Sequence, residues 1–209
     1  MRKPRYRRRK EERPQQITAA AFDVFAEKGY ARARVQEVAE RAGVSKGLMY
    51  LYFKTKEELF KAVIKSVVVR RVDALIDAAN DTTLSSEEFL RGPFADFMKK
   101  IPASPVAVVI RLLVSEGPRH PDIVDYYWNN VVSKGIATIS SFLDRGIANG
   151  EFRKTKIGDV PQLVVAPMIV ATIWNLLFTR QPVDATILVD TQIDMLLDYL
   201  RADRSVANA

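Results

Sequence analysis

A succession of helix start and stop signals is the feature that most constrains the fold of this chain. Apolar residues recur at helical spacing over residues 14–28, which open with Pro14 and end at Gly29, and a second short helix is expected to end at Gly43. No alternation of apolar and polar residues lasts long enough to indicate a strand. The chain is therefore predicted to be all-α, with about nine helices.

Most of the remaining helices have a boundary signal of their own. Ser45 is predicted to cap a third helix, and Thr55 with Glu58 forms a capping box for a fourth that runs to about residue 80. Ser85 with Glu88 is a second capping box. Later helices are expected from Pro105 after Ser104, over about 122–148, over 160–180 with Asp159 as cap, and over 184–202.

One of these segments is apolar enough to be compared with a membrane span. No residue from Val160 to Thr179 is charged, and a stretch of that length could cross a bilayer. It contains polar residues and two prolines, however, and the mean hydropathy of the chain is only −0.07. A helix that is apolar all round also suits a protein core or a subunit interface, so we expect a buried or dimerising helix.

Composition narrows the function classes. The chain has 209 residues, 48% of them hydrophobic, no cysteine and one histidine. Disulfides and thiolate zinc sites are excluded, and a cytoplasmic location is expected. The sequence shows no nucleophile–base constellation, no glycine-rich phosphate loop and no cluster of metal ligands, so neither an enzyme nor a cofactor is expected.

The positive charge is concentrated at one end. Net charge is +7, and residues 1–13 alone hold eight Lys or Arg side chains against two glutamates. Such a segment cannot bury apolar surface and is expected to be a disordered basic arm. It is either a solvated tail or an arm that lies along DNA phosphates or in a minor groove.

A helix-turn-helix spacing follows this arm. Small and apolar residues at Val38, Ala39 and Ala42, a glycine at Gly43 and an apolar Met49 suit two helices that cross at a tight turn. A purely structural helical hairpin would have the same pattern, so the spacing alone leaves both interpretations open.

The outward face of the third helix favours DNA binding over a structural hairpin. If Met49 and Phe53 point inward, then Lys46, Tyr50 and Lys54 lie on a different stripe, and Tyr52 is displaced again. Tyrosine hydroxyls and lysine ammonium groups donate to phosphate oxygens, and the helix N-terminus adds its backbone N–H groups.

These residues resemble the DNA-binding domain of the TetR (tetracycline repressor) family of transcriptional regulators over about residues 14–62. The resemblance rests on the run from Phe25, Gly29 and Tyr30 through Gly43-Val44-Ser45-Lys46-Gly47 to Tyr50-x-Tyr52-Phe53-Lys54-x-Lys56. It implies that the third helix enters the major groove, with Lys46 and Gly47 close to base edges or backbone. The DNA-binding residues that it implies are Arg34, Gln36, Ser45, Lys46, Gly47, Leu48, Tyr50, Tyr52 and Lys56.

The chain departs from the family pattern at two places. Family members usually have Thr or Ser around positions 33 and 34, where this chain has Ala33 and Arg34, so a weaker cap on the second helix is expected. Leu48 stands where many members have a small polar residue. It is expected either to contact a thymine methyl group or to pack on Val44 or the first helix.

The resemblance also implies a domain organisation and a mechanism. Residues 14–60 would form the DNA-binding domain and residues 61–209 a ligand-binding and dimerisation domain, paired with a second copy through the last two helices. The expected function is that of a homodimeric, ligand-responsive regulator, and more specifically a repressor, that binds double-stranded DNA at a palindromic operator. A ligand-independent architectural DNA-binding protein is the alternative.

The small-molecule effector is unknown from sequence, and its candidate pocket residues are aromatic or polar groups set in apolar helices. Plain core packing is the competing interpretation for the aromatics and for Met98. Arg111 is expected to pair with Glu116 or Asp122 rather than with an anionic ligand, and His120 to be exposed. The candidates are Phe94, Phe97, Met98, Arg111, Glu116, Tyr127, Trp128, Trp174, Asn175 and Phe178.

Overall fold

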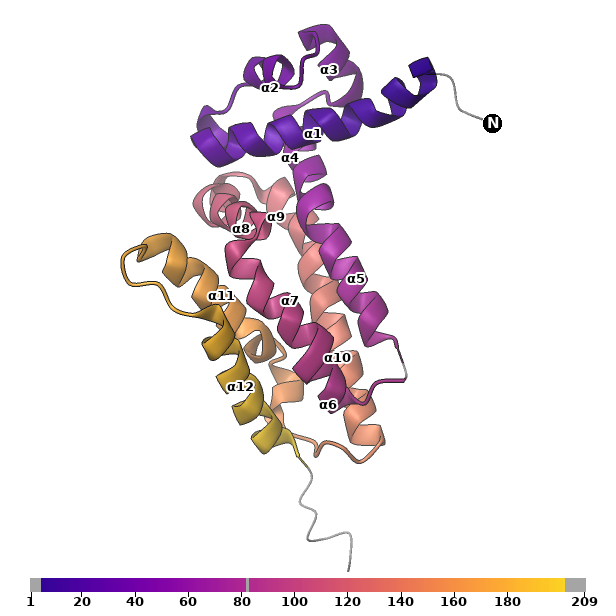
Figure 1. Cartoon of the computed structure of the whole chain (residues 1–209), viewed down its shortest axis with the longest axis vertical. Helices are drawn as coiled ribbons and strands as arrows, with labels where there is room; N and C mark the ends of the chain where they lie inside the picture. Colours follow the sequence, from indigo (N-terminus) through magenta and orange to yellow (C-terminus); the bar gives the residue numbers. More distant parts are fainter. Residues whose placement is uncertain (1–4, 82, 202–209) are drawn as a thin grey trace, which may run out of the picture. The chain divides into compact units, whose positions relative to one another are not determined.

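The computed structural model describes residues 5–81 and 83–201, which are mostly helical (Figure 1). π-helical turns at Lys65–Val69, Leu90–Phe94 and Trp128–Val132 join α4 to α5, α6 to α7 and α9 to α10 into three longer helices. The described residues thus contain nine helices and no strand, as predicted. The segments are α1 (Arg5–Arg32), α2 (Val35–Arg41), α3 (Lys46–Tyr52), α4 (Lys56–Ile64), α5 (Arg70–Ala79), α6 (Ser86–Phe89), α7 (Ala95–Lys100), α8 (Pro105–Glu116), α9 (Pro121–Tyr127), α10 (Ser133–Ala148), α11 (Gln162–Leu177) and α12 (Ala185–Leu200).

The chain divides into two compact units that do not follow chain order. The first unit contains the described residues up to Arg70 together with Val108–Trp128. The second contains the described residues of Arg71–Ala107 and those from Asn129 to Arg201. Helices α1–α4 therefore share their compact unit with most of α8 and with α9.

Several predicted helix boundaries are confirmed by side-chain caps. The Ser45 hydroxyl accepts from the backbone N–H of Leu48 at 3.1 Å, and the Thr55 hydroxyl accepts from that of Glu58 at 3.0 Å. The capping box at Ser85 is complete, because the Glu88 carboxylate also accepts from the Ser85 N–H. The box at Thr55 is only half formed, since the Glu58 carboxylate accepts from the Lys54 N–H instead.

Two predicted helix starts are wrong. Helix α1 begins at Arg5 rather than at Pro14, so its helical pattern extends into the segment expected as a basic arm, whose residues 1–4 lie outside the described ones. Helix α11 begins at Gln162, after Pro161, and no side chain caps it. Asp159 instead ends a short 3-10 turn, Lys156–Asp159, and Pro161 occupies the N-cap position of α11, so Asp159 lies outside the helix start.

An aromatic cluster forms the core of the first unit. The rings of Phe25, Tyr30 and Phe60 pack with centroids 5.2 to 5.6 Å apart, and all three side chains are buried. Gly29 has a φ of 76° that interrupts α1 just before Tyr30. That left-handed residue turns the end of α1, so the predicted break at Gly29 is confirmed as a kink after which the helix resumes to Arg32.

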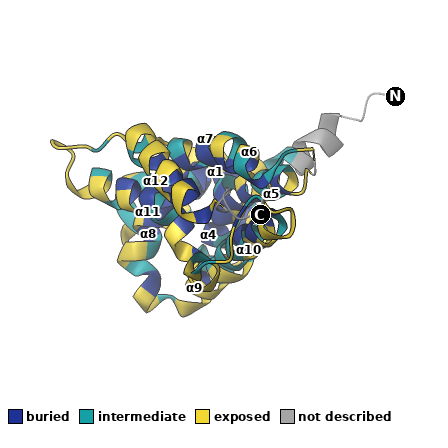
Figure 2. Cartoon of the chain, turned by 90° about the horizontal axis from the view of Figure 1, so that it is seen from below, coloured by how far each residue is buried: buried dark blue, intermediate teal, exposed yellow. Residues whose placement is uncertain are grey.

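A second aromatic cluster forms the core of the other unit. Phe89, Phe94 and Phe142 lie 5.3 to 6.0 Å apart between centroids and are buried. The buried Ser86 hydroxyl donates to the Phe142 carbonyl at 2.9 Å, which ties α6 to α10. Leucine and valine side chains from α12 complete this core, so one face of α12 is buried and the other, shown in yellow in Figure 2, is exposed.

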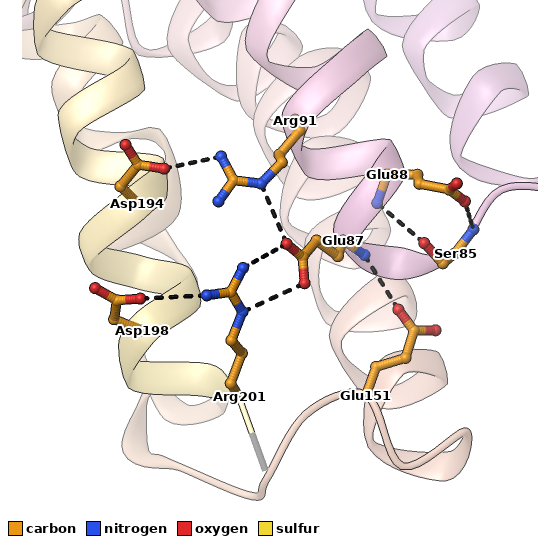
Figure 3. A network of polar contacts seen from close by, with 8 residues as sticks. All are labelled: Ser85, Glu87, Glu88, Arg91, Glu151, Asp194, Asp198 and Arg201. Carbon is orange, nitrogen blue, oxygen red and sulfur yellow. Dashed lines mark hydrogen bonds and ion pairs between the residues drawn. The ribbon is translucent and has the colours of Figure 1, made fainter. Parts of the chain in front are cut away.

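A polar network fixes the end of α12 to α6 at the surface (Figure 3). Arg201 donates to the Glu87 carboxylate at 2.7 Å, and Arg91 links Glu87 to Asp194 on α12. The Arg201 guanidinium holds the pKa of Glu87 below its usual value. These contacts link α12 to α6 and to the π-helical turn that follows α6.

Among the described residues, no helix is long and apolar enough to cross a membrane. The uncharged segment forms α11, in which Val164, Ala171 and Thr172 are buried. The expectation of a buried or dimerising helix in place of a membrane span is consistent with this burial.

Candidate nucleic-acid interface

A tight turn joins α2 to α3. Gly43 has a φ of 62°, a left-handed conformation that favours glycine, and the Val44 N–H donates to the Ala39 carbonyl at 3.0 Å. Val38 and Ala39 are buried beneath the turn. The predicted helix-turn-helix is therefore present, with its small residues at the helix crossing.

Helix α3 is anchored by one fully buried side chain. Met49 has no exposed surface, and the Phe53 N–H at the end of the helix donates to the Met49 carbonyl at 3.0 Å. Phe53 itself is half-buried. The predicted inward pair is therefore made mainly by Met49, with Phe53 at the margin.

The outward surface of α3 carries the residues expected to bind DNA. Lys46, Gly47 and Tyr50 are exposed, whereas Leu48 and Tyr52 are half-buried. The Ser45 side chain is exposed but its hydroxyl already caps α3. The surface also carries a residue that the sequence analysis overlooked, Leu51, whose side chain is 79% exposed.

At the start of α2, a carboxylate binds the backbone N–H of the N-cap residue Arg34, but no side chain of Arg34 caps the first turn, in agreement with the weaker cap expected there. Glu37 accepts from the Arg34 N–H at 3.1 Å and from the Lys28 ammonium at 2.7 Å. The Lys28 contact is the main reason that the pKa of Glu37 lies below its usual value. The Arg34 side chain is exposed and Gln36 donates to Glu40, so both side chains lie at the surface where the resemblance places them.

Lys56 faces the protein as well as the surface. Its ammonium donates to the Ala31 carbonyl at 2.9 Å and lies 4.5 Å from the centre of the Tyr30 ring. Burial lowers the pKa of Lys56 below its usual value. This side chain therefore joins the start of α4 to the end of α1, a contact that the sequence did not reveal.

Two residues of the α8–α9 region contact α1. His120 is half-buried with its ring 4.8 Å from that of Tyr30, so the expectation that it is exposed is wrong. Arg111 donates to the Ala26 carbonyl at 2.7 Å, whereas its expected partner Glu116 lies 4.0 Å from Arg119. Because both contacts lie within the first unit, they fasten residues far along the chain to the DNA-binding helices.

The proposed pocket residues do not form one group. Phe94 and Met98 are buried in the second core, and Phe97 packs at its edge. Arg111, Glu116, Tyr127 and Trp128 belong to the first unit, where burial raises the pKa of Tyr127 to about 12. Trp174 and Phe178 form an exposed ring pair with centroids 4.7 Å apart, and Asn175 exchanges two hydrogen bonds with the backbone of Val183.

An apolar groove of about 510 Å³ runs along the outer faces of α11 and α12. Several of the apolar side chains that line it are exposed, namely Leu163, Val170, Met195 and Tyr199. Ile187, also on α12, is exposed as well. None of the described residues that line the groove is charged.

The described residues include no group of three His, Cys, Asp or Glu side chains placed to hold a metal ion. The anchored α3, with Lys46 and Tyr50 exposed on its outer surface, in a chain whose described residues are mostly helical, defines a helix-turn-helix DNA-binding regulator.

Comparison with known proteins gives the family. The family model of bacterial regulatory proteins of the tetR family matches residues 17–63, and that of the AefR-like transcriptional repressor C-terminal domain matches residues 88–198. The chain belongs to the TetR family of transcriptional regulators, as the sequence resemblance indicated.

Three similar proteins are informative. The HTH-type transcriptional activator FasR of Mycolicibacterium smegmatis is 38% identical over 96 residues, which cover 43% of this chain and 42% of FasR. The fatty acid metabolism regulator protein of Bacillus subtilis is 25% identical over 191 residues, 90% of this chain and 96% of that protein. The crystal structure of the regulator FadR from Bacillus subtilis in complex with stearoyl-CoA has a TM-score of 0.74 at 20% identity, over 88% of this chain and 98% of FadR.

Proposed function

We propose that this chain is a homodimeric repressor that binds a palindromic operator and releases it when an acyl-CoA binds to the second unit. The observation that carries the proposal is the exposed surface of α3, with Lys46 and Tyr50 held outward by the buried Met49. Lysine and tyrosine supply donors for phosphate oxygens at the edges of the major groove. A protein of this kind acts where the chromosome is, in the cytoplasm.

The groove on α11 and α12 supports the homodimer. Side chains such as Ile187 and Met195 are 66% and 67% exposed although they are large and apolar. A continuous apolar surface of this kind marks an interaction site, and a two-fold axis would let the same two helices cover it. A dimer would also supply the two recognition helices that a palindrome requires.

Repression is favoured by the C-terminal match. The model that covers residues 88–198 describes a transcriptional repressor, and this match spans more than half of the chain. The FasR relative is an activator, but its similarity covers only 43% of this chain. A reporter gene placed behind the operator distinguishes the two, because a repressor lowers its expression and an activator raises it.

The relatives favour a long-chain acyl-CoA as the effector. The Bacillus subtilis protein that is similar to 90% of this chain is named a fatty acid metabolism regulator. A structure of similar fold contains stearoyl-CoA. An acyl chain needs an apolar lining, which Phe97 and Met98 could contribute, and the nucleotide needs cationic or hydrogen-bonding partners. The remaining candidate pocket residues, from Phe94 to Phe178, stay predictions.

The experiment starts from the DNA upstream of the gene for this chain. Footprinting with the full chain should protect a palindrome, and stearoyl-CoA should release the DNA while stearate or CoA alone should not. Protection without any palindrome, unaffected by every acyl-CoA, would support the architectural DNA-binding alternative. If only the effector arm fails, the DNA-binding proposal stands and the acyl-CoA proposal falls.

A further inference from the structure

Leu51 occupies the most outward position of the recognition helix. At about 100° per residue, a side chain two positions after Met49 projects about 200° away from it, which is nearly the opposite direction. Met49 is fully buried, and Leu51 is correspondingly 79% exposed. The helix therefore presents an aliphatic side chain, and not a polar one, at the crest that faces away from the protein.

The neighbouring positions keep this crest clear. Gly47 lies four residues earlier, and therefore on the same ridge as Leu51. A Cβ atom added at Gly47 would meet nothing within 4 Å, so packing inside the chain does not require a glycine there. A small residue beside an exposed leucine leaves room for another surface to approach the backbone of α3 closely.

Polar groups flank the crest. Lys46 and Tyr50 are exposed on one side of the ridge, and the half-buried Leu48 and Tyr52 lie on the other. If the ridge enters a major groove, the lysine and tyrosine donors reach the phosphates at its edges while Leu51 reaches the floor. Leu48 is placed to contact the groove wall, with part of its surface already covered.

We propose that Leu51 selects a thymine in each operator half-site by apolar contact with the thymine 5-methyl group. This inference rests on the proposed DNA-binding function. A leucine can neither donate nor accept a hydrogen bond, so against polar base edges it would leave donors and acceptors unpaired. The thymine methyl is the apolar group that the four bases present in the major groove.

The test begins with a selection of random duplex DNA by the full chain. Each thymine of the selected site is then replaced in turn by deoxyuridine, which deletes only the methyl group. One thymine in each half-site should show a loss of affinity of about three- to fivefold, the value of one buried aliphatic carbon. Leu51→Ala should bind the thymine and uracil duplexes equally at that position, and Leu51→Asn should shift its preference toward adenine.

Leu48→Ala is the matched control, because it removes an equal number of atoms from the same helix and should keep the uracil effect at that thymine. Loss of the effect in Leu48→Ala but not in Leu51→Ala would overturn the proposal and assign the contact to Leu48. Insensitivity of the unaltered protein to every uracil would also overturn it while leaving specific DNA binding intact. If no sequence is enriched, the proposed function fails, and the role of Leu51 fails with it.

Discussion

The outward face of α3 and the outward face of α11 and α12 both expose large apolar side chains, but in different settings. Leu51 stands on a short helix whose neighbouring surface carries Lys46 and Tyr50. Met195 instead lines an apolar groove, and none of the described residues that line this groove is charged. The difference teaches that the surroundings of an exposed apolar residue indicate its partner: a polyanion with one apolar group in the first case, an apolar protein surface in the second.

The largest effect is expected from a charge placed in the apolar groove. Met195→Glu should convert the dimer to a monomer and lower operator affinity by about 100-fold or more, because a buried, unpaired carboxylate costs several kcal/mol. Sedimentation and DNA titration measure the two effects. Val114→Glu, at a position on α8 that is also exposed, is the control and should remain dimeric. A dimeric Met195→Glu variant would show that the groove does not form the interface.

The next largest effect separates the two sides of α3. Met49→Ala should lower the free energy of unfolding by about 2–5 kcal/mol, since the side chain is fully buried and its removal leaves a cavity. Leu51→Ala on the opposite side should change it by no more than about 0.5 kcal/mol. Urea unfolding of both variants measures this contrast. Equal losses would mean that Leu51 packs against the protein and is not free to contact DNA.

A smaller effect should distinguish the tyrosines of the two faces. Tyr50→Phe removes a phosphate donor and should weaken DNA binding by about three- to tenfold, equally for all operator variants. Tyr199→Phe deletes the same hydroxyl from the groove on α12 but keeps the apolar ring, so the dimer measured by sedimentation and the operator affinity at fixed salt should both stay unchanged. A change of base preference in Tyr50→Phe would show that this tyrosine reads bases and not the backbone.

The smallest effect is expected on the stability of the fold at acid pH, and it comes from two ion pairs between α1 and α2. Arg41 lowers the pKa of Glu27 and Lys28 lowers that of Glu37, each from an ordinary value of 4.5. A carboxylate with a lowered folded-state pKa stabilises the fold above pH 4.5, and this contribution is lost as pH falls through the lowered value. Thermal unfolding from pH 6 down to 3 should therefore show a shallower loss for Glu37→Gln than for the unaltered chain.

Glu40→Gln is the matched control for that measurement, because the Glu40 carboxylate accepts from the neutral Gln36 amide and not from a cation. Its acid transition should follow that of the unaltered chain. High salt should reduce the contribution of Glu37, since the pair with Lys28 is partly exposed to solvent. Identical acid profiles for all three proteins would remove Glu37 as a contributor.

Local sequence signals predicted most of the fold. Capping residues and glycines mark helix ends through contacts within a few residues, and Ser45, Ser85 and Gly43 act as expected. The start of α11 differs from the prediction because the residues around Asp159 form a separate 3-10 turn and the helix begins only after Pro161. The three π-helical turns are not indicated by any of the local sequence patterns that mark the helix ends.

The candidate site was predictable only in part. The inward anchor Met49 and the outward Lys46 and Tyr50 follow from helical periodicity. The same periodicity places Leu51 opposite Met49, so the exposure of Leu51 also follows from the sequence. By contrast, the contact of Arg111 with Ala26 joins residues 85 positions apart, and no local pattern specifies such a pair.

The sharing of one compact unit by the helix-turn-helix and Val108–Trp128 bears on how such regulators are recombined. Tyr30 packs on His120, so the segment that carries this histidine contributes part of the packing of the helix-turn-helix unit. A fragment cut after Arg70 would expose that surface to water. A chimaera that joins this DNA-binding unit to the ligand-binding domain of another regulator would therefore have to include both stretches of chain, although they are separate in the sequence.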